Sequence, residues 1–374
     1  MAKIVIAPDK FKGSLSGLEF CDIVKQGIKK HCPDSEIIKC PLADGGDGTI
    51  DALAYYLDGH MEELTVSDPL LRPIKASYLL STDKQTAFIE MSAASGIRLL
   101  KKEELNPLKT STYGTGELIK DAINKGARHI LLGIGGSATN DGGLGMATAL
   151  GFQFYDIRGK LLRGIGADLE QLHWIDNSNL HPQLKNIKFE VACDVDNPLF
   201  GPDGAATVYA PQKGADSRMV KQLDDGLRNY NDIIKQTLNI DLQGIKGAGA
   251  AGGLGAGCIA FLNSELKPGI ELMKEAADFE EQIKDTDWLI TGEGQLDQQT
   301  LSGKVINGIM NSLSTQKLAI FCGVNRLTDE ELAETPVSYI DEIAPKALNI
   351  DDSMANAAKY LEVITEKFAI AHLL

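Results

Sequence analysis

Short apolar runs that end in turn residues occur toward both ends of the chain, and this pattern constrains the fold most. The runs are KIVIAPD (3–9), EIIKCPLA (36–43), WLITGEG (288–294) and LAIFCGV (318–324). Runs of this length and character are typical of strands buried on both faces of a parallel sheet. Segments with helical spacing follow the first two runs. The sequence therefore predicts an open α/β sheet to which both ends of the chain contribute.

The middle of the chain has a different pattern. Its first strand-like segments are 61–66, 74–80 and 86–91. They are short, partly alternating in polarity and separated by turn residues, which favours antiparallel or mixed strands. We therefore expect two α/β domains. The first is discontinuous and consists of residues 1–65 plus 281–374, and the second is an inserted mixed α/β domain of residues 66–280.

The composition is that of a folded protein with an acidic balance. The 374 residues are 43% hydrophobic and carry a formal net charge of −15, which argues against binding to nucleic acid or to an anionic membrane. No apolar run approaches the ~20 residues of a membrane-spanning helix, and no secretory signal is visible. The six cysteines show no metal-binding spacing and read as reduced thiols. We expect a cytoplasmic enzyme.

A glycine-rich loop, GIGGSATNDGGLG (133–145), follows the apolar run HILL. Backbone N–H groups in such a loop can point at an anion, and glycine lets a phosphate approach without meeting a Cβ atom. The predicted phosphate-binding residues are Gly135, Gly136, Ser137, Thr139, Asn140 and Asp141. The structural alternative is a tight turn where two backbones cross, with Asn140 and Asp141 capping a helix.

A second glycine cluster, GAGAAGGLGAG (247–257), contains the spacing GxGxxG. A dinucleotide site needs a clear strand directly before the glycines, and LNIDLQGIK is a poor one. Close packing of a helix start against another backbone explains the cluster equally well. A P-loop is excluded, because the only Gly-Lys pair before a helix is followed by Val305, and Gln298 stands where the motif requires glycine.

Acidic residues stand where predicted strands end, which is where open α/β sheets bind their ligands. They are Asp9, Asp44, Asp47, Asp194, Asp196, Glu293 and Asp297. A Mg²⁺ site uses one or two carboxylates plus substrate phosphates, and a proton acceptor needs one more. Any one of these residues could instead be a cap or a turn former. The candidates for binding an anion are Lys10, Lys12, Ser14 and Arg72.

Motifs along essentially the whole chain resemble the bacterial glycerate kinase family, the type without a P-loop. They are IVIAPDKFKGSLSG (4–17), PLADGGDGT (41–49), IEMSAASGI (89–97), NPLKTSTYGTGELI (106–119), IGGSATNDGG (134–143), VACDVDNPLFGPDGA (191–205), PQKGA (211–215), GAGAAGGLG (247–255) and ITGEGQLDQQTLSGK (290–304). The chain departs from the family pattern at Lys10, where serine is usual, and at Gln295, where a basic residue is usual.

The resemblance implies ATP-dependent phosphorylation of D-glycerate with Mg²⁺, and 2-phosphoglycerate is favoured over 3-phosphoglycerate as the product. It also implies that the discontinuous domain is flavodoxin-like, with a mostly parallel sheet, and that an active-site cleft lies between the two domains. On this basis the loop 135–141 is expected to hold the ATP phosphates.

The same hypothesis assigns the remaining candidate residues. Asp194 would be the base that accepts the proton of the attacking hydroxyl, and Glu293 and Asp297 would hold Mg²⁺. Lys12, Ser14 and Arg72 would bind the glycerate carboxylate, with Lys12 also counted as catalytic. Asp44 would bind substrate or serve as an alternative metal ligand.

Two other functions stay open on the residues alone. The 247–252 glycines would suit an NAD-dependent oxidoreductase that acts on a small hydroxy acid. A non-catalytic sensor that binds a small anion is the other alternative, and it would be stabilised by its ligand without turnover. The oligomeric state is open as well, with a homodimer among the alternatives.

Overall fold

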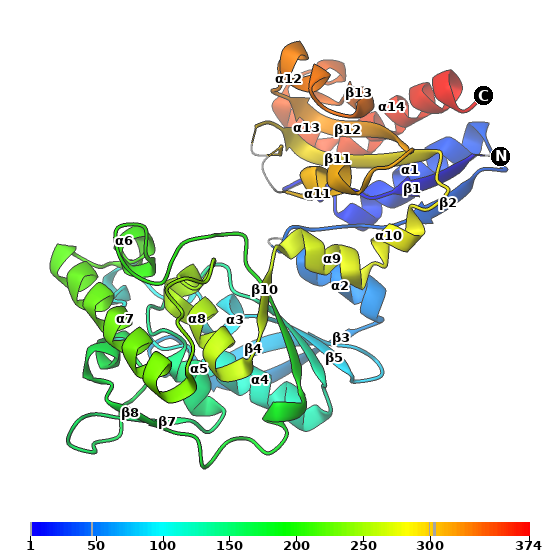
Figure 1. The fold of residues 1–374 in the computed structure, drawn as a ribbon. Coiled ribbons are helices and arrows are strands. Elements are labelled where there is room, and N and C mark those ends of the chain that lie inside the picture. Colours follow the sequence, from blue (N-terminus) through cyan, green and yellow to red (C-terminus); the bar gives the residue numbers. More distant parts are fainter. Residues whose placement is uncertain (1, 46–47, 299, 302–303) are drawn as a thin grey trace. The chain divides into compact units, whose positions relative to one another are not determined.

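The computed structural model describes residues 2–45, 48–298, 300–301 and 304–374 (Figure 1). The chain forms two compact units: unit 1 consists of Met1–Tyr56 and Pro268–Leu374, and unit 2 of Leu57–Lys267. The boundaries predicted from the sequence are near residues 65 and 280. The first lies earlier because β3 (His60–Ser67) pairs with the next strand of unit 2. The second lies earlier because the helices that follow residue 268 belong to unit 1.

Unit 1 is built on a parallel sheet of five strands in the order β13-β12-β11-β1-β2. The strands are β1 (Lys3–Ile6), β2 (Glu36–Lys39), β11 (Trp288–Leu296), β12 (Lys317–Asn325) and β13 (Val337–Glu342). Every neighbouring pair is parallel. Numbered within the unit, the spatial order is 2-1-3-4-5, which is the flavodoxin-like order. The predicted parallel sheet is confirmed.

The helices of unit 1 follow from local sequence signals. They are α1 (Gly17–His31), α2 (Thr49–Leu57), α9 (Gly269–Ala276), α10 (Phe279–Gln282), α11 (Val305–Ser312), α12 (Asp329–Ala333), α13 (Ile350–Ala355) and α14 (Ala357–His372). Helix α1 begins at a capping box in which Ser16 and Glu19 satisfy each other's backbone N–H groups. Its apolar face, including Phe20, packs with Phe321 and Phe368 in the core of the unit.

Unit 2 contains a mixed sheet of six strands in the order β10-β9-β6-β5-β4-β3. Besides β3, the strands are β4 (Pro73–Leu80), β5 (Thr86–Glu90), β6 (His129–Gly133), β9 (Lys188–Ala192) and β10 (Glu265–Lys267), and a separate antiparallel pair is β7 (Gln153–Tyr155) with β8 (Trp174–Asp176). The β3–β4 and β4–β5 pairs are antiparallel, and the other three are parallel. The predicted mixed α/β character is confirmed.

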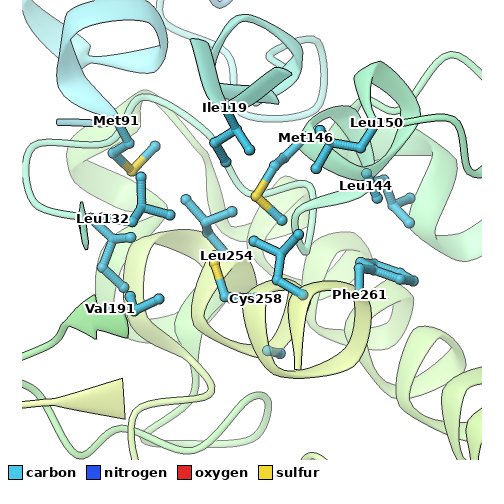
Figure 2. Close-up of a cluster of buried hydrophobic side chains, with 14 of the residues drawn as sticks. Met91, Ile119, Leu132, Leu144, Met146, Leu150, Val191, Leu254, Cys258 and Phe261 are labelled. Carbon is cyan, nitrogen blue, oxygen red and sulfur yellow. The ribbon is translucent and has the colours of Figure 1, made fainter. Parts of the chain in front are cut away.

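A large apolar core holds the helices of unit 2 against its sheet. The helices are α3 (Ser92–Ser95), α4 (Tyr113–Lys125), α5 (Leu144–Ala149), α6 (Ala205–Tyr209), α7 (Ser217–Leu238) and α8 (Ala250–Leu262). The 3₁₀ helices of the chain are Ile97–Leu99, Lys102–Glu104, Gly166–Gln171, Leu184–Asn186, Pro211–Lys213 and Ala344–Lys346. Figure 2 shows Leu254 and Cys258 of α8 among side chains from β6, β9 and α5. None of the helices in the described part of the chain has the length and apolar character needed to cross a membrane.

Candidate functional sites in the two units

In unit 1 two acidic residues lie where β1 and β11 run side by side. The backbone N–H of Asp9 donates to the Gly292 carbonyl oxygen at 2.9 Å, which keeps the segment after β1 against β11. Glu293 belongs to β11 itself. In a flavodoxin-like sheet the strand order reverses between these two strands, and ligands bind at the carboxyl ends of the strands at this point. Asp9 and Glu293 therefore occupy the expected ligand-binding edge of unit 1.

Both carboxyl groups are electrostatically perturbed. Burial raises the pKa of Asp9 to about 7, and the charge of Asp44 adds to the effect. Burial also raises the pKa of Glu293 to about 7, although a hydrogen bond from Thr300 acts in the opposite direction. The positive charge of Lys304 lowers both pKa values. Asp9 and Glu293 are largely removed from solvent and lie near one positive charge, that of Lys304. A ligand that brings further positive charge would stabilise their ionised forms.

The expected metal ligands Glu293 and Asp297 have different environments. The Oε1 atom of Glu293 is buried and has no hydrogen-bond partner among the residues that the structure describes, which is uncommon for a carboxylate oxygen. Asp297 accepts hydrogen bonds from the Thr300 N–H at 3.3 Å and from the Gln295 amide at 2.8 Å. Within the described residues, no group of three or more His, Cys, Asp or Glu side chains is arranged to hold a metal ion. Since Mg²⁺ usually takes only one or two carboxylates from the protein, these residues fit such an ion when a substrate supplies further oxygens.

The other candidates of unit 1 lie in the loops after β1 and β2. Lys12 is exposed, and Ser14 lies in a turn closed by hydrogen bonds between Phe11 and Leu15. Asp44 is half-buried, and its charge reaches Asp9. Asp47 lies outside the described residues.

A pocket of about 330 Å³ opens beside Asp9 and Lys10 in unit 1. Its other walls include Leu42, Leu18 and Tyr55, so that a mostly apolar space adjoins the acidic edge of the sheet. This combination is typical of binding sites for small organic molecules.

In unit 2 the glycine loop follows β6, as predicted, but only its first part faces solvent. Gly135 and Gly136 are exposed, whereas Ser137 is 8% exposed and Thr139 and Asn140 are completely buried. The helix expected to complete an anion cradle is α5, which has only 6 residues. The exposed backbone at Gly135 and Gly136 is therefore the part of the loop that a ligand can reach directly.

Asp141 has a structural position within this loop. Its fully buried carboxylate accepts hydrogen bonds from the Thr112 N–H and hydroxyl, both at 2.8 Å, and from the N–H groups of Gly143 and Gly145 at 3.1 and 3.2 Å. Burial raises the pKa of Asp141, while these hydrogen bonds lower it. The carboxylate fixes the glycine loop to the start of α4.

The second glycine cluster packs against the first. A Cβ atom on Gly252 would lie 2.1 Å from the Thr139 carbonyl oxygen, and one on Gly257 would lie 2.5 Å from the Gly142 carbonyl oxygen. The Gly142 N–H also donates to the Gly252 carbonyl oxygen at 3.1 Å. These glycines are required for close approach of two backbones, which leaves no space for a dinucleotide at Gly252. The feature that carried the oxidoreductase alternative is therefore explained by packing.

A buried lysine beneath the glycine loop was missed by the sequence reasoning. Lys213 is 1% exposed, and its Nζ donates to Ser137 Oγ at 2.6 Å and to the Thr139 carbonyl oxygen at 2.7 Å. Burial lowers the pKa of Lys213 to about 7, although the charge of Asp141 acts in the opposite direction. The only available signal was a lysine in the small-residue segment PQKGA.

Asp194 and Arg72, the remaining candidates, also belong to unit 2. Asp194 is exposed and follows the end of β9. Arg72 is half-exposed and forms ion pairs with the buried Asp68 at 2.6 Å and with Glu104 at 2.5 Å. A substrate carboxylate at Arg72 would have to share the guanidinium with these two acids.

By fold and by the chemistry of these sites, the chain is an α/β enzyme suited to anionic substrates. A model of the glycerate kinase family matches residues 4–373. The chain is 42% identical over 372 residues to a glycerate kinase of Halalkalibacterium halodurans, covering 99% of this chain and 98% of that protein. It is 45% identical over 328 residues to the glycerate 2-kinase of Escherichia coli, covering 88% of this chain and 86% of that protein.

A solved structure agrees with these sequence matches. The crystal structure of a Salmonella typhimurium LT2 protein described as a glycerate kinase 2 matches with a TM-score of 0.89 at 40% identity, covering 99% of this chain and 97% of that one. The chain belongs to the glycerate kinase family, as its motifs implied.

Proposed function

We propose that this protein transfers a phosphoryl group from ATP to D-glycerate, with Mg²⁺ as the metal and 2-phosphoglycerate as the favoured product. Family membership supports the substrate, and the Escherichia coli relative named as a glycerate 2-kinase supports the position of transfer. The structural observation that carries the proposal is the buried Oε1 of Glu293 at the expected ligand-binding edge of unit 1, which has no hydrogen-bond partner in the described part of the chain. Such an oxygen is suited to a cation that accompanies phosphate groups.

The loop 135–141 is the candidate for the ATP phosphates. Gly135 and Gly136 would offer their exposed backbone N–H groups, and the Ser137 hydroxyl lies next to them. Thr139, Asn140 and Asp141 are buried, so they would act by fixing the shape of the loop. Fixed backbone donors stabilise the charge of a phosphoryl group in transfer without having to reorganise.

Glu293 and Asp297 would hold Mg²⁺, and Asp44 is the alternative ligand. When bound, the metal neutralises charge on the phosphate oxygens. The nearby Lys304 would add fixed positive charge to the same region, because its charge already reaches Glu293.

Lys12, Ser14 and Arg72 would bind the glycerate carboxylate, with Asp44 as a further substrate contact. Asp194 would accept the proton of the attacking hydroxyl, a step that typically contributes about 10²–10⁴-fold to the rate. Asp9 is the second candidate for this base, because its carboxyl group lies at the carboxyl end of β1 and interacts with the charge of Glu293.

The test is release of ADP from ATP and Mg²⁺ with D-glycerate, L-glycerate or no acceptor, and the product is then passed to enolase. ADP that depends on D-glycerate and direct turnover by enolase are the expected results. ADP without enolase turnover would instead assign the 3-phosphate. No ADP above the blank, together with stabilisation by glycerate, would favour the anion sensor.

A further inference from the structure

Lys213 is a buried lysine whose amino group has no carboxylate partner among the described residues. Its Nζ has a hydroxyl and a carbonyl oxygen as acceptors, at Ser137 and Thr139, and no carboxylate oxygen of the described chain lies within 4.0 Å of it. Asp141 is the charged group whose field reaches it, and the Asp141 oxygens are occupied by other donors. A buried ammonium group is costly unless a negative charge compensates it.

The surface directly above this cation is suited to an anion. Among the described residues, the N–H groups of Gly135 and Gly136 donate to no acceptor, and both glycines are exposed. Gly136 has φ +72°, and a Cβ atom on Gly135 would meet nothing within 4 Å. Successive N–H groups in such a turn form a concave anion site. Because Ser137 Oγ accepts from Lys213, its own hydrogen is available to donate outward.

Two buried side chains of the loop have unsatisfied polar atoms. Thr139 Oγ1 and both polar atoms of the Asn140 side chain are buried and have no hydrogen-bond partner among the described residues. Buried polar atoms in native proteins are nearly always satisfied. The three exceptions here lie on the consecutive residues Thr139 and Asn140, in the segment that also contacts the buried Lys213.

We propose that Lys213 is the internal counter-charge of a phosphate site at Gly135–Ser137, and that binding of a phosphate anion there is coupled to uptake of a proton by the protein. This inference rests on the proposed function in taking ATP as the source of the phosphate. Lys213 acts as a positioning residue, because its ammonium group reaches the anion through the Ser137 hydroxyl.

The surroundings of Lys213 determine whether the protein takes up or releases a proton when a phosphate anion binds. Burial lowers the pKa of Lys213 to about 7, so that most molecules hold it neutral at pH 8 in the absence of ligand. A bound anion favours the charged ammonium and raises this pKa, so the protein takes up as much as about one proton per site. A phosphate bound by permanently charged groups would lose protons instead, so the sign of the change is diagnostic.

The experiment is isothermal titration of the full chain at pH 8 with pyrophosphate and with ADP, without metal, in buffers of different ionisation enthalpy. The wild type should bind with uptake of about 0.5–1 proton. Lys213→Met should weaken binding at least about tenfold, as expected for loss of a charge-assisted contact, and abolish the uptake. Lys213→Arg should bind without uptake, because its guanidinium stays charged. Lys221→Met, on the exposed face of α7, is the matched control and should leave both quantities unchanged.

Folding of each variant is checked by circular dichroism, and Lys213→Arg keeps the test valid if Lys213→Met does not fold. Proton release by the wild type, no binding of either ligand, or unchanged affinity and uptake in both Lys213 variants would overturn the inference. None of these binding measurements depends on whether the protein phosphorylates D-glycerate. Proton-coupled binding that requires Lys213, in a protein without D-glycerate-dependent ADP release, would instead overturn the proposed function and leave this inference standing.

Discussion

Replacement of glycine by alanine should have different effects at two positions of the glycine clusters. It should lower stability at Gly252 and weaken ATP binding at Gly135. Gly252→Ala places a Cβ atom 2.1 Å from the Thr139 carbonyl oxygen, at a residue with φ +70°. The left-handed conformation costs about 1–2 kcal/mol for a residue with a side chain, and overpacking against backbone costs about 1–3 kcal/mol more. The free energy of unfolding of unit 2 should therefore fall by about 2–5 kcal/mol.

Gly135→Ala is the matched variant, because a Cβ atom there meets nothing within 4 Å. Its stability should stay within about 0.5 kcal/mol of the wild type. The added methyl group would, however, stand where a phosphate must approach the backbone, so the KM for ATP should rise about tenfold or more. Stability and ligand binding would thus respond separately to the two substitutions.

The assay is differential scanning calorimetry together with steady-state kinetics on both variants. A loss of 2–5 kcal/mol corresponds to a decrease of about 4–20 °C in the melting temperature of a unit of this size. A melting temperature of Gly252→Ala within about 1 °C of the wild type would refute the packing role of Gly252. So would a decrease in the melting temperature of Gly135→Ala that is as large as the one expected for Gly252→Ala. An unchanged KM for ATP in Gly135→Ala would move the phosphate site away from this loop.

Three further predictions concern single side chains. Arg72→Ala should mainly raise the KM for D-glycerate with little change in kcat, and an unchanged KM in a glycerate titration would place the carboxylate site elsewhere. Asp194→Asn should lower kcat by about 10²–10⁴-fold, and a loss below about tenfold in single-turnover experiments would remove it as the base. For Glu190, burial raises the pKa but hydrogen bonds from Lys267 and two further basic groups lower it more, to about 2. Its stabilising contribution should be complete above the ordinary pKa of about 4.5 and be lost as the pH falls toward 2. Glu190→Gln should therefore lose about 3 kcal/mol at pH 7, and urea unfolding of both proteins should show that this difference shrinks below pH 4.5; a constant difference would contradict the assignment.

The parallel sheet of unit 1 could be predicted because its determinants are local. Residues 4–6 of β1 and 288–290 of β11 are apolar and buried at every position, as expected for a strand covered on both faces. Their direct pairing, with Ile6 opposite Ile290, joins residues that are 284 positions apart in the chain of 374. The strand pattern alone predicts that both ends of the chain contribute to one sheet, and the resemblance to a known family adds that this domain is flavodoxin-like.

The candidate sites were predictable in location more than in detail. A glycine loop after a buried strand was recognised from composition, but its division into an exposed and a buried part depends on distant partners. Asp141 is fixed by Thr112, and Ser137 by Lys213, which lies 76 positions along the chain. Neither partner carries a local signal. Likewise the packing role of Gly252 depends on Thr139, a residue that periodicity does not connect with it.

This division of the glycine loop explains how one short segment can be both rigid and open to a ligand. An anion site gains most when its donors are fixed before the ligand arrives, because then no binding energy is spent on ordering them. Asp141 anchors one end of the loop through four hydrogen bonds, and Lys213 holds its centre from below. The Gly136 carbonyl oxygen accepts a hydrogen bond from the Ile97 N–H at 2.9 Å, whereas the N–H groups of Gly135 and Gly136 have no acceptor among the described residues, and both glycines are exposed. Substitutions in the anchors should therefore weaken phosphate binding through loss of order in the loop, whereas Gly135→Ala, whose added Cβ atom meets nothing within 4 Å, should weaken it by steric exclusion alone.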